Sequence, residues 1–372
     1  PPDRRTGLHE ICITDLAPIH KALRDKPLIH LDATLRPEIA RRLLPNLTVT
    51  EIDAGAPHMT VRLVTGRFGK TTLCEDARAS TEENTRRARH LRDVVDYVRW
   101  QALRSPQVAT LVITYASCEQ AFADIPGVRT AHFNAIAGLD IHKDVDRIIL
   151  IGRPIPGSDD LEHLTGALLG KEVQGSYATE DRAVRMHDGS SGSVRVLAHT
   201  DPSAELVRAA ICDDELIQAM GRGRGVNRTG ANPLDVHILA DVALPLVHDT
   251  VTAWDMVAPD IFQKMLLAGL AVDSPADAAV LHPAMFANFE QTKKQFQRGL
   301  FKGQTSYKDP IREMSLKSAA YRRSGRGRGW QRAWWVEGLA SDAGARARIE
   351  QVVGELAHWR TGQMPNRLSR CA

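Results

Sequence analysis

Three arginines stand close together in a glycine-rich run, residues 218–228, which reads QAMGRGRGVNR. A guanidinium group stays ionised at neutral pH and can bind two oxygens of a phosphate at once. Arg222, Arg224 and Arg228 are therefore suited to stabilise negative charge on a phosphoryl group during its transfer. A basic surface loop that only contacts nucleic acid would have the same composition, and in isolation the run favours that simpler interpretation.

A turn followed by a carboxylate forms a second pattern. Gly138 and Asp140 lie in residues 137–141 (AGLDI), shortly before the apolar run 147–151. Glycine allows a sharp backbone turn, and an aspartate can accept hydrogen bonds from a ribose or from an arginine. The simpler interpretation is a loop with a surface carboxylate.

Residues 66–72 (GRFGKTT) are the candidate for a phosphate-binding loop, because they follow an apolar run and contain Gly-Lys-Thr. The full pattern, Gly-x-x-x-x-Gly-Lys-Ser/Thr, requires a glycine five residues before Gly69, and that residue is Val64. The loop is therefore too short, and we interpret it as a polar turn with a solvated Lys70. A shortened loop that binds phosphate through backbone amides stays open as an alternative.

Short apolar runs that alternate with helical patterns must position these residues. Strands are expected at 28–31, 60–64, 109–115, 147–151, 194–198 and 236–239, and helices at 36–44, 85–103, 160–169 and 204–220. Continuous apolar strands between amphipathic helices predict an α/β fold with a mostly parallel sheet and helices on both faces. Ligands in such sheets usually bind beyond the carboxyl ends of the strands.

Two departures from this alternation define the domain organisation. Residues 177–198 alternate polar and apolar positions around a Gly-rich turn, which predicts an inserted β-hairpin. After about residue 245 the strand pattern fades, with helices expected in 257–298 and at 343–360. We therefore expect a first domain at 1–245 and a smaller, mainly α-helical, basic domain at 246–372.

The second domain is basic over a limited stretch. Residues 291–335 contain twelve Lys or Arg and two acidic residues, in a chain whose net charge is only +3. Such asymmetry indicates a polyanionic partner. Arginines can neutralise phosphates while tryptophan stacks on bases, a mixture that suits single-stranded DNA; the candidates are Arg322, Arg323, Arg326, Arg328 and Trp330. Buried tryptophans beside solvated arginines are the alternative.

Composition limits the class of protein. The chain has 372 residues, 43% hydrophobic and 25% charged, as in ordinary soluble proteins, and no apolar run long enough to span a membrane. Five scattered cysteines form no Cys-x-x-Cys pair, which argues against a zinc site or a disulfide framework and favours the cytoplasm. The start has neither a signal-peptide pattern nor an initiator Met, so we expect a fragment or a processed chain.

Taken together and in this order, the patterns resemble superfamily 2 nucleic-acid helicases, over roughly residues 28–245. Residues 138–141 look like motif V, and Gln218, Gly221 and Arg222 fit the Gln-x-x-Gly-Arg core of motif VI. Strand 109–114, which ends at Thr114, is placed like motif IV, and residues 31–35 (LDATL) resemble motif III. The long run from motif V to the arginine-rich motif VI is similar to the helicase portions of phage- and plasmid-type primase–helicase proteins.

The resemblance implies a RecA-like second motor lobe that closes on ATP and Mg²⁺ held mainly by an N-terminal P-loop lobe, in the same or another chain. Its arginine finger would come from Arg222, Arg224 or Arg228, near Gln218, in a protein that replicates the DNA of a mobile element. Gly138 and Asp140 would couple the nucleotide to the DNA track.

By the same resemblance, Asp32 and Thr34 would relay hydrolysis to strand movement, and Thr114 would contact the nucleic acid. The family pattern expects an arginine at position 225, which is Gly225 here, so the choice of finger stays open. The alternatives are a non-catalytic DNA-binding module on a degenerate helicase fold and a self-contained NTPase that uses residues 66–72.

Overall fold

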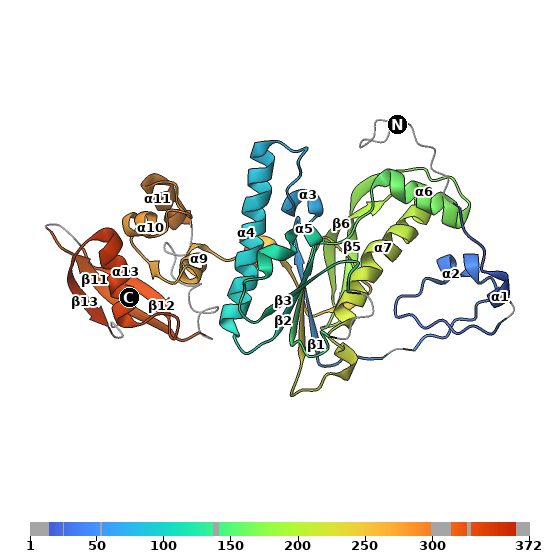
Figure 1. Ribbon diagram of the computed structural model, residues 1–372, viewed down its shortest axis with the longest axis horizontal. Coiled ribbons are helices and arrows are strands. Elements are labelled where there is room, and N and C mark those ends of the chain that lie inside the picture. The colour runs from blue at the N-terminus through green and yellow to red at the C-terminus, as the bar shows by residue number, and fades with distance from the viewer. Residues whose placement is uncertain are drawn as a thin grey trace. The chain divides into compact units, whose positions relative to one another are not determined.

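The computed structural model describes residues 15–24, 26–52, 54–136, 141–298, 314–325 and 329–361. The chain divides into two compact units, labelled by element in Figure 1. Unit 1 comprises Pro1–Leu91 and Gln107–Val257, and unit 2 comprises Arg92–Pro106 and Ala258–Ala372. Within the described ranges, no helix combines the length and the apolar character needed to cross a membrane.

Unit 1 is built on a six-stranded, all-parallel sheet in the order β3-β2-β4-β7-β1-β9. Figure 1 shows α6 and α7 on one side of the sheet and α4 on the other. This is the predicted α/β architecture, and it is consistent with a RecA-like lobe. The strands are β1 (Met59–Thr65), β2 (Thr110–Thr114), β3 (Val128–His132), β4 (Arg147–Ile151), β7 (Leu234–Leu239) and β9 (Thr250–Ala253).

The helices of unit 1 follow the expected alternation with the strands. They are α1 (Lys21–Arg24), α2 (Pro37–Leu43), α3 (Lys70–Leu73), α4 (Thr81–Arg104), α5 (Ala116–Glu119), α6 (Ser158–Leu169), α7 (Pro202–Gly221) and α8 (Trp254–Val257), with 3-10 turns at Gln120–Phe122 and Gly225–Asn227. Helix α4 contributes its last part, from Arg92, to unit 2.

The central strands explain why the sheet is parallel. Every residue of β2 and of β4 is buried, so both faces of these strands are covered. Only a strand covered on both faces can be apolar throughout without exposing apolar side chains. The runs TLVIT and RIILI are therefore the sequence signature of the sheet centre.

Three expectations for unit 1 need correction. Residues 28–31 form no strand, and Leu28, Ile29 and Leu31 are 64%, 85% and 90% exposed. Strands β3 and β9 were not predicted, because they are short and only partly apolar. Since β9 and α8 still belong to unit 1, that unit ends at Val257 and not at residue 245.

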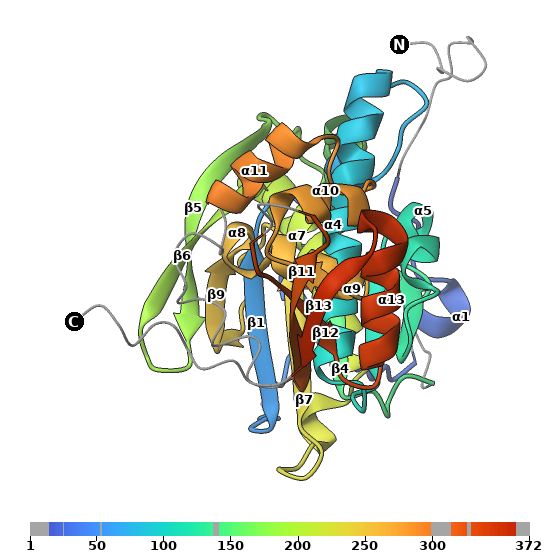
Figure 2. The same ribbon diagram turned by 90° about the vertical axis from the view of Figure 1, so that its left-hand side faces the viewer.

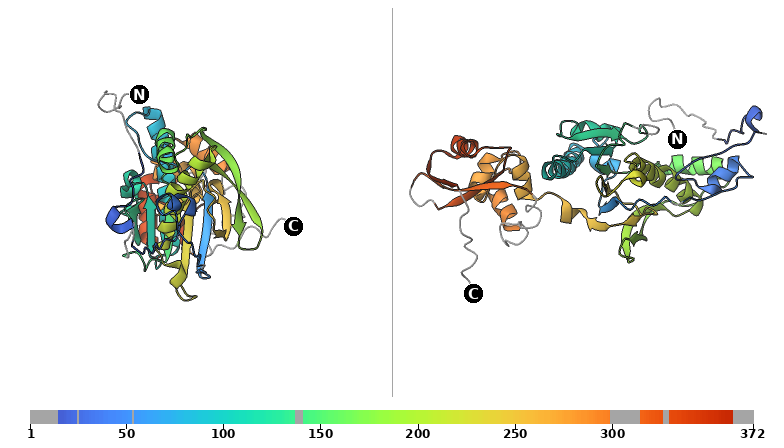
Figure 3. Two further views of the ribbon diagram at one scale, coloured as in Figure 1. Left: turned by 90° about the vertical axis from the view of Figure 1, so that its right-hand side faces the viewer. Right: turned by 90° about the horizontal axis from the view of Figure 1, so that it is seen from below.

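The predicted hairpin is confirmed. Strand β5 (Tyr177–Met186) pairs antiparallel with β6 (Ser191–His199), and β8 (Val247–His248) adds a short third strand. Gly189 takes φ +83° in the turn, and Ser190 donates its backbone N–H to Asp188 Oδ1. The two long strands lie side by side in Figure 2 and in the left panel of Figure 3.

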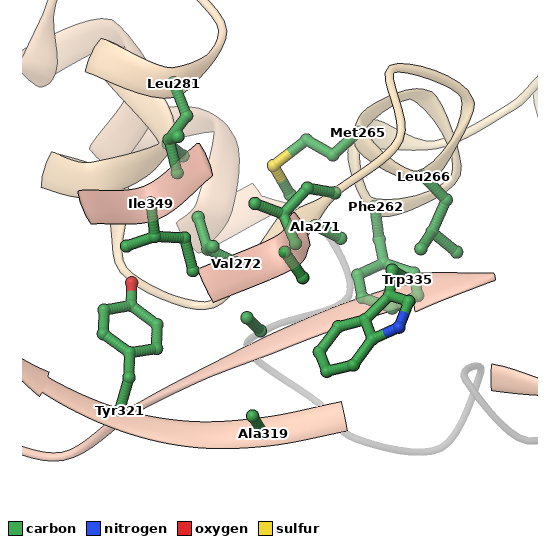
Figure 4. Close-up of a cluster of buried hydrophobic side chains, with 14 of the residues drawn as sticks. Phe262, Met265, Leu266, Ala271, Val272, Leu281, Ala319, Tyr321, Trp335 and Ile349 are labelled. Carbon is green, nitrogen blue, oxygen red and sulfur yellow. The ribbon is translucent and has the colours of Figure 1, made fainter. Parts of the chain in front are cut away.

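Unit 2 combines helices with a four-stranded antiparallel sheet in the order β10-β12-β11-β13. Phe262, Met265, Tyr321, Trp335 and Ile349 form its core between sheet and helices (Figure 4). Its elements are α9 (Ile261–Leu267), β10 (Ala271–Val272), α10 (Pro275–Leu281), α11 (Phe289–Arg298), β11 (Leu316–Arg323), β12 (Gln331–Val336), α13 (Asp342–Val353) and β13 (Leu356–Thr361).

The sequence interpretation missed this sheet. Five arginines stand within residues 322–332, where β11 ends and β12 begins, so the sequence there looks like a charge run rather than a pair of strands. The helix expected at 343–360 ends at Val353, because Gly354 adopts φ +88°, and β13 takes the remaining residues.

Candidate functional site at the amino edge of the parallel sheet

The segments that directly precede β4 and β7 meet at one edge of the parallel sheet. Residues 141–146 lead into β4, and residues 222–233 lead into β7. These strands are parallel neighbours, and Asp235 N donates to Asp146 O at 2.9 Å. Both segments therefore lie at the amino ends of the strands. The expectation that ligands bind beyond the carboxyl ends of the strands stays a prediction, and these two segments lie at the other edge.

Helix α7, which leads into the arginine loop, also holds the motif III candidate. Gln218 Nε2 donates to Thr34 Oγ1 at 3.0 Å, and Asp214 accepts Arg36 Nε and Nη2 at 2.6 and 2.7 Å. Positions 214 and 218 are four residues apart and share one face of the helix. One stripe of α7 thus fixes residues 34–36.

A neighbouring stripe of α7 binds Asn134, which follows the carboxyl end of β3. Glu215 Oε1 accepts the backbone N–H of Asn134 at 2.9 Å, and Asn134 adopts φ +66°. The pKa of His142 is lowered by burial, and the positive charges of Arg129 and Arg222 lower it further. Arg222 therefore lies close to the end of the motif V segment. Gly138 and Asp140 themselves lie outside the described residues.

Asp32 and Thr34 form a local hydrogen-bonded turn. Thr34 donates to Asp32 Oδ1 through both its backbone N–H and its Oγ1, at 2.8 and 3.1 Å. Burial raises the pKa of Asp32, but hydrogen bonds from Thr34 and His30 outweigh burial, so the pKa is lowered. The Asp32 carboxylate is thus held ionised and bonded to Thr34, and the same Thr34 hydroxyl accepts a hydrogen bond from Gln218.

Arg228 is committed to holding the two loops together. Its side chain is buried, and its guanidinium donates to the backbone oxygens of Gly223, Lys143 and Val145. The bonds to Lys143 and Val145 close the arginine loop onto the segment before β4, and the bond to Gly223 closes the loop on itself. The guanidinium of Arg228 is consequently used inside the protein, which makes this residue a poor candidate for the finger.

Two glycines present Arg224 at the surface. A Cβ on Gly223 would lie 2.7 Å from Leu234 Cδ2, and one on Gly225 would lie 2.7 Å from Met59 Sδ, so the loop presses closely on the strand ends. Between them Arg224 is exposed with φ +53°. A non-glycine residue in this region costs about 1–2 kcal/mol, and such strain often accompanies function.

Arg222 ends helix α7 beside this loop. It is half-buried, and its Nε is shielded from solvent without a hydrogen-bond partner among the described residues. A buried N–H without an acceptor is costly unless a ligand or water satisfies it. Arg222 and Arg224 are therefore the two arginines of the run whose placement suits an incoming anion.

A pocket of about 1050 Å³ opens beside the motif III candidate. Residues 30–38 and 47–52 line it together with Asp214, Ile217 and Pro245. Ile52, on its rim, is 88% exposed. The pocket therefore combines the hydrogen-bonded turn at Asp32 with an apolar wall.

The loop of residues 66–72 lies at the opposite, carboxyl edge and is filled by its own side chains. Phe68 is fully buried against Trp254, at 5.3 Å between ring centroids, and a Cβ on Gly66 would lie 2.9 Å from the Phe68 ring. Thr72 Oγ1 donates to the backbone oxygens of Arg67 and Gly69. Helix α3, which follows, has four residues. This geometry fits the interpretation of a polar turn.

Thr114 is also at the carboxyl edge, and its expected contact with nucleic acid is wrong for this structure. Its side chain is fully buried, and its Oγ1 has no hydrogen-bond partner in the described part of the chain. A hydroxyl enclosed by the core cannot reach a nucleic acid without unfolding of the strand end.

The basic stretch of unit 2 divides between the two faces of its sheet. Trp330 is 40% exposed and Arg322 is half-buried, whereas Arg323 binds Asp277 Oδ1 and the backbone oxygen of Val353, both at 2.9 Å. Arg323 is therefore used within the core side of the unit. Arg326 and Arg328 lie outside the described residues.

Sequence reasoning missed three basic residues that share a face with Arg322, namely Arg332, His358 and Arg360. The alternation of Arg332 with buried Ala333 and Trp335 could have revealed β12. Strand β13 was hidden because its residues were assigned to a helix.

Comparisons with known proteins add no assignment, since no family model, curated protein or solved structure matches this chain. Among the described residues, no three His, Cys, Asp or Glu side chains converge as a metal site requires. The helicase resemblance assigns ATP and Mg²⁺ mainly to a separate P-loop lobe, so both stay predictions.

Proposed function

We propose that the chain is the second motor lobe of an ATP-dependent DNA helicase or translocase of superfamily 2. The observation that supports this most strongly is that helix α7 binds the motif III candidate and then leads directly into the arginine loop. Helix α7 binds Thr34 and Arg36 on one stripe and Asn134 on the next, and it ends in the loop that presents Arg222 and Arg224.

In this proposal ATP is the substrate and is held by a separate P-loop lobe. When the lobes close, Arg222 and Arg224 approach the γ-phosphate and stabilise the charge that spreads over its oxygens as the bond to the leaving group breaks. Arg228 positions the loop through its three backbone acceptors. Gln218 donates a hydrogen bond to Thr34, and Thr34 donates one to Asp32. These bonds connect the end of helix α7, which leads into the arginine loop, to the motif III candidate.

The exposed apolar segment at 28–31 supports a partner lobe. Leu28, Ile29 and Leu31 are mostly exposed, although the next residues are fixed on α7. An extended apolar segment with unpaired backbone groups is suited to join the edge of another sheet. A cytoplasmic setting, in the replication of a mobile element's DNA, completes the proposal.

The test is ATP hydrolysis stimulated by single-stranded DNA, measured with the chain joined to or mixed with a P-loop lobe. Arg222→Ala combined with Arg224→Ala should lower kcat by about 10³-fold, the range of an arginine finger. The matched control, Arg86→Ala with Arg195→Ala, removes two exposed arginines elsewhere in unit 1 and should keep full activity.

Intact hydrolysis in the Arg222/Arg224 variant would overturn the motor proposal and leave a non-catalytic DNA-binding module. Turnover by the chain alone that disappears in Lys70→Ala would favour a self-contained NTPase instead.

A further inference from the structure

The outer face of the unit 2 sheet carries a compact set of basic and aromatic side chains. Residues directly opposite in an antiparallel pair share a face. Ala320 lies opposite Arg332 on one side and Arg360 on the other, so these three form a row across β12, β11 and β13. Arg322 lies opposite His358 in the next row.

This outer face is the one turned away from the core. Ala319, Tyr321, Ala333 and Trp335 alternate with the residues of the rows and are buried, and Figure 4 shows Tyr321 and Trp335 pointing toward the helices. The alternation of side chains along a strand therefore places Arg322, Arg332 and Arg360 on the opposite side.

Trp330 is held in place over this face. It directly precedes β12, its ring stacks on His358 at 5.7 Å with an interplanar angle of 23°, and the Arg360 guanidinium carbon lies 4.6 Å from the ring centroid. Both partners come from β13, and the indole stays 40% exposed. An aromatic ring that is fixed but still exposed can accept a flat partner with little loss of side-chain entropy.

The face is positively charged, with the partly buried Asp273 beside one of its arginines, where it accepts the backbone N–H of Arg332 at 2.7 Å. No Asp or Glu occupies any of its positions in the described strands, and within the described residues neither Arg322 nor Arg360 pairs with a carboxylate. The nearby acidic groups are used elsewhere: Asp277 binds Tyr321 and Arg323, and Asp342 accepts the Trp359 indole N–H.

We propose that this face, formed by Arg322, Trp330, Arg332, His358 and Arg360, binds single-stranded nucleic acid. The arginines neutralise phosphates while an unpaired base stacks on Trp330. The bases of a duplex are already stacked on one another, so a duplex would use the arginines but not the indole. An acidic protein segment would likewise have no use for it. The inference deepens the proposed function, on which the choice of DNA as the natural ligand rests, by adding a DNA-binding surface outside the parallel sheet.

The experiment titrates the full chain, without nucleotide, into a fluorescein-labelled oligothymidylate of about 16 nucleotides and follows anisotropy over a series of salt concentrations. Arg322→Gln with Arg360→Gln should weaken binding at least tenfold at low salt. It should also reduce the slope of log K against log salt by about 0.7 for each phosphate that is no longer neutralised. Arg346→Gln on α13, which removes an exposed charge from the same unit, is the control and should match the wild type to within its single charge.

Trp330→Ala should weaken binding about tenfold without changing the salt slope, because stacking releases no counterions. Trp330→Phe should restore most of the affinity. Thermal melting of each variant confirms that it is folded.

The proposal is overturned if the Arg322/Arg360 variant binds like Arg346→Gln at every salt concentration. The single-strand assignment would be refuted if the chain bound a duplex as tightly as the oligothymidylate and if Trp330→Ala did not weaken binding. If polyglutamate displaced the labelled oligonucleotide as effectively as unlabelled oligonucleotide does, the partner would be an acidic protein instead. The titration contains no ATP and measures only binding of the oligonucleotide. Its result therefore does not depend on whether the chain takes part in ATP hydrolysis.

Discussion

The two edges of the parallel sheet use glycine in opposite ways. At the carboxyl edge Gly66 makes room for the protein's own Phe68, so the loop that contains Gly-Lys-Thr has no open cradle. At the amino edge Gly223 and Gly225 draw the loop onto the strand ends, and Arg224 between them is exposed. The comparison teaches that a motif's letters indicate chemistry only when neighbouring side chains leave its functional groups accessible.

The largest expected difference in stability between the two edges comes from replacing Arg228. Arg228→Met should destabilise the protein by about 3 kcal/mol, since a buried guanidinium satisfied by three backbone oxygens leaves those oxygens unpaired when it is removed. Urea unfolding measures the effect. Arg67→Met at the carboxyl edge, where the side chain is exposed, is the control and should change stability by less than about 0.5 kcal/mol.

An equal cost for both variants would mean that the amino edge is no more tightly built than the carboxyl edge. Arg228→Lys sharpens the result further. A lysine keeps the charge but lacks the planar fork that reaches several acceptors, so it should restore little of the stability.

A single methyl group tests the close approach of the arginine loop. Gly223→Ala places a Cβ within 2.7 Å of Leu234 Cδ2 and 2.8 Å of Ile148 Cδ1, and both side chains are fully buried. Overpacking of this kind costs about 2 kcal/mol. Gly69→Ala at the other edge meets nothing closer than 3.9 Å and has φ −68°, so it should be neutral or slightly stabilising. Thermal unfolding of the pair decides, and a neutral Gly223→Ala would show that the loop is not pressed onto the strands.

A feature of the fold or of the candidate site could be predicted from the sequence only where the residues that form it are close together along the chain. The buried runs of β2 and β4 predict a parallel sheet, because burial on both faces leaves a local signature. The hydrogen bond between Gln218 and Thr34 joins residues 184 apart, and nothing local in either segment requires it. That the segments before β4 and β7 are neighbours follows from strand order, which a single sequence does not determine.

The outer face of unit 2 could not be predicted for a different reason. Arg322 stands next to buried Tyr321 and Arg332 next to buried Ala333, but the five arginines within residues 322–332 conceal both strands in the sequence. Arg360 became part of the face only once β13 was placed beside β11. The charge run therefore indicated a polyanionic partner, while the set of residues that would bind it required the strand register.

The smallest expected effect concerns pH and the amino end of β7. His237 is almost fully buried, and burial lowers its pKa although its hydrogen bond to Asp235 opposes this. A histidine whose pKa is lower in the folded state stabilises the protein above the unfolded value near 6.5, and this stability is lost as the pH falls. Asp235 has its pKa lowered too, since hydrogen bonds and charges from His237 and Arg62 outweigh its burial, and its contribution disappears only below about pH 4.

Urea unfolding at pH 7 and pH 5 leaves Asp235 ionised throughout, and the difference between the wild type and His237→Gln separates His237 from the other buried histidines. His237→Gln, which cannot take up a proton, should lose less stability between the two pH values than the wild type does. His187→Gln removes an exposed histidine from the hairpin turn and should leave the wild-type pH dependence unchanged. If His237→Gln and His187→Gln respond alike, the buried imidazole is not the group that makes this edge sensitive to acid.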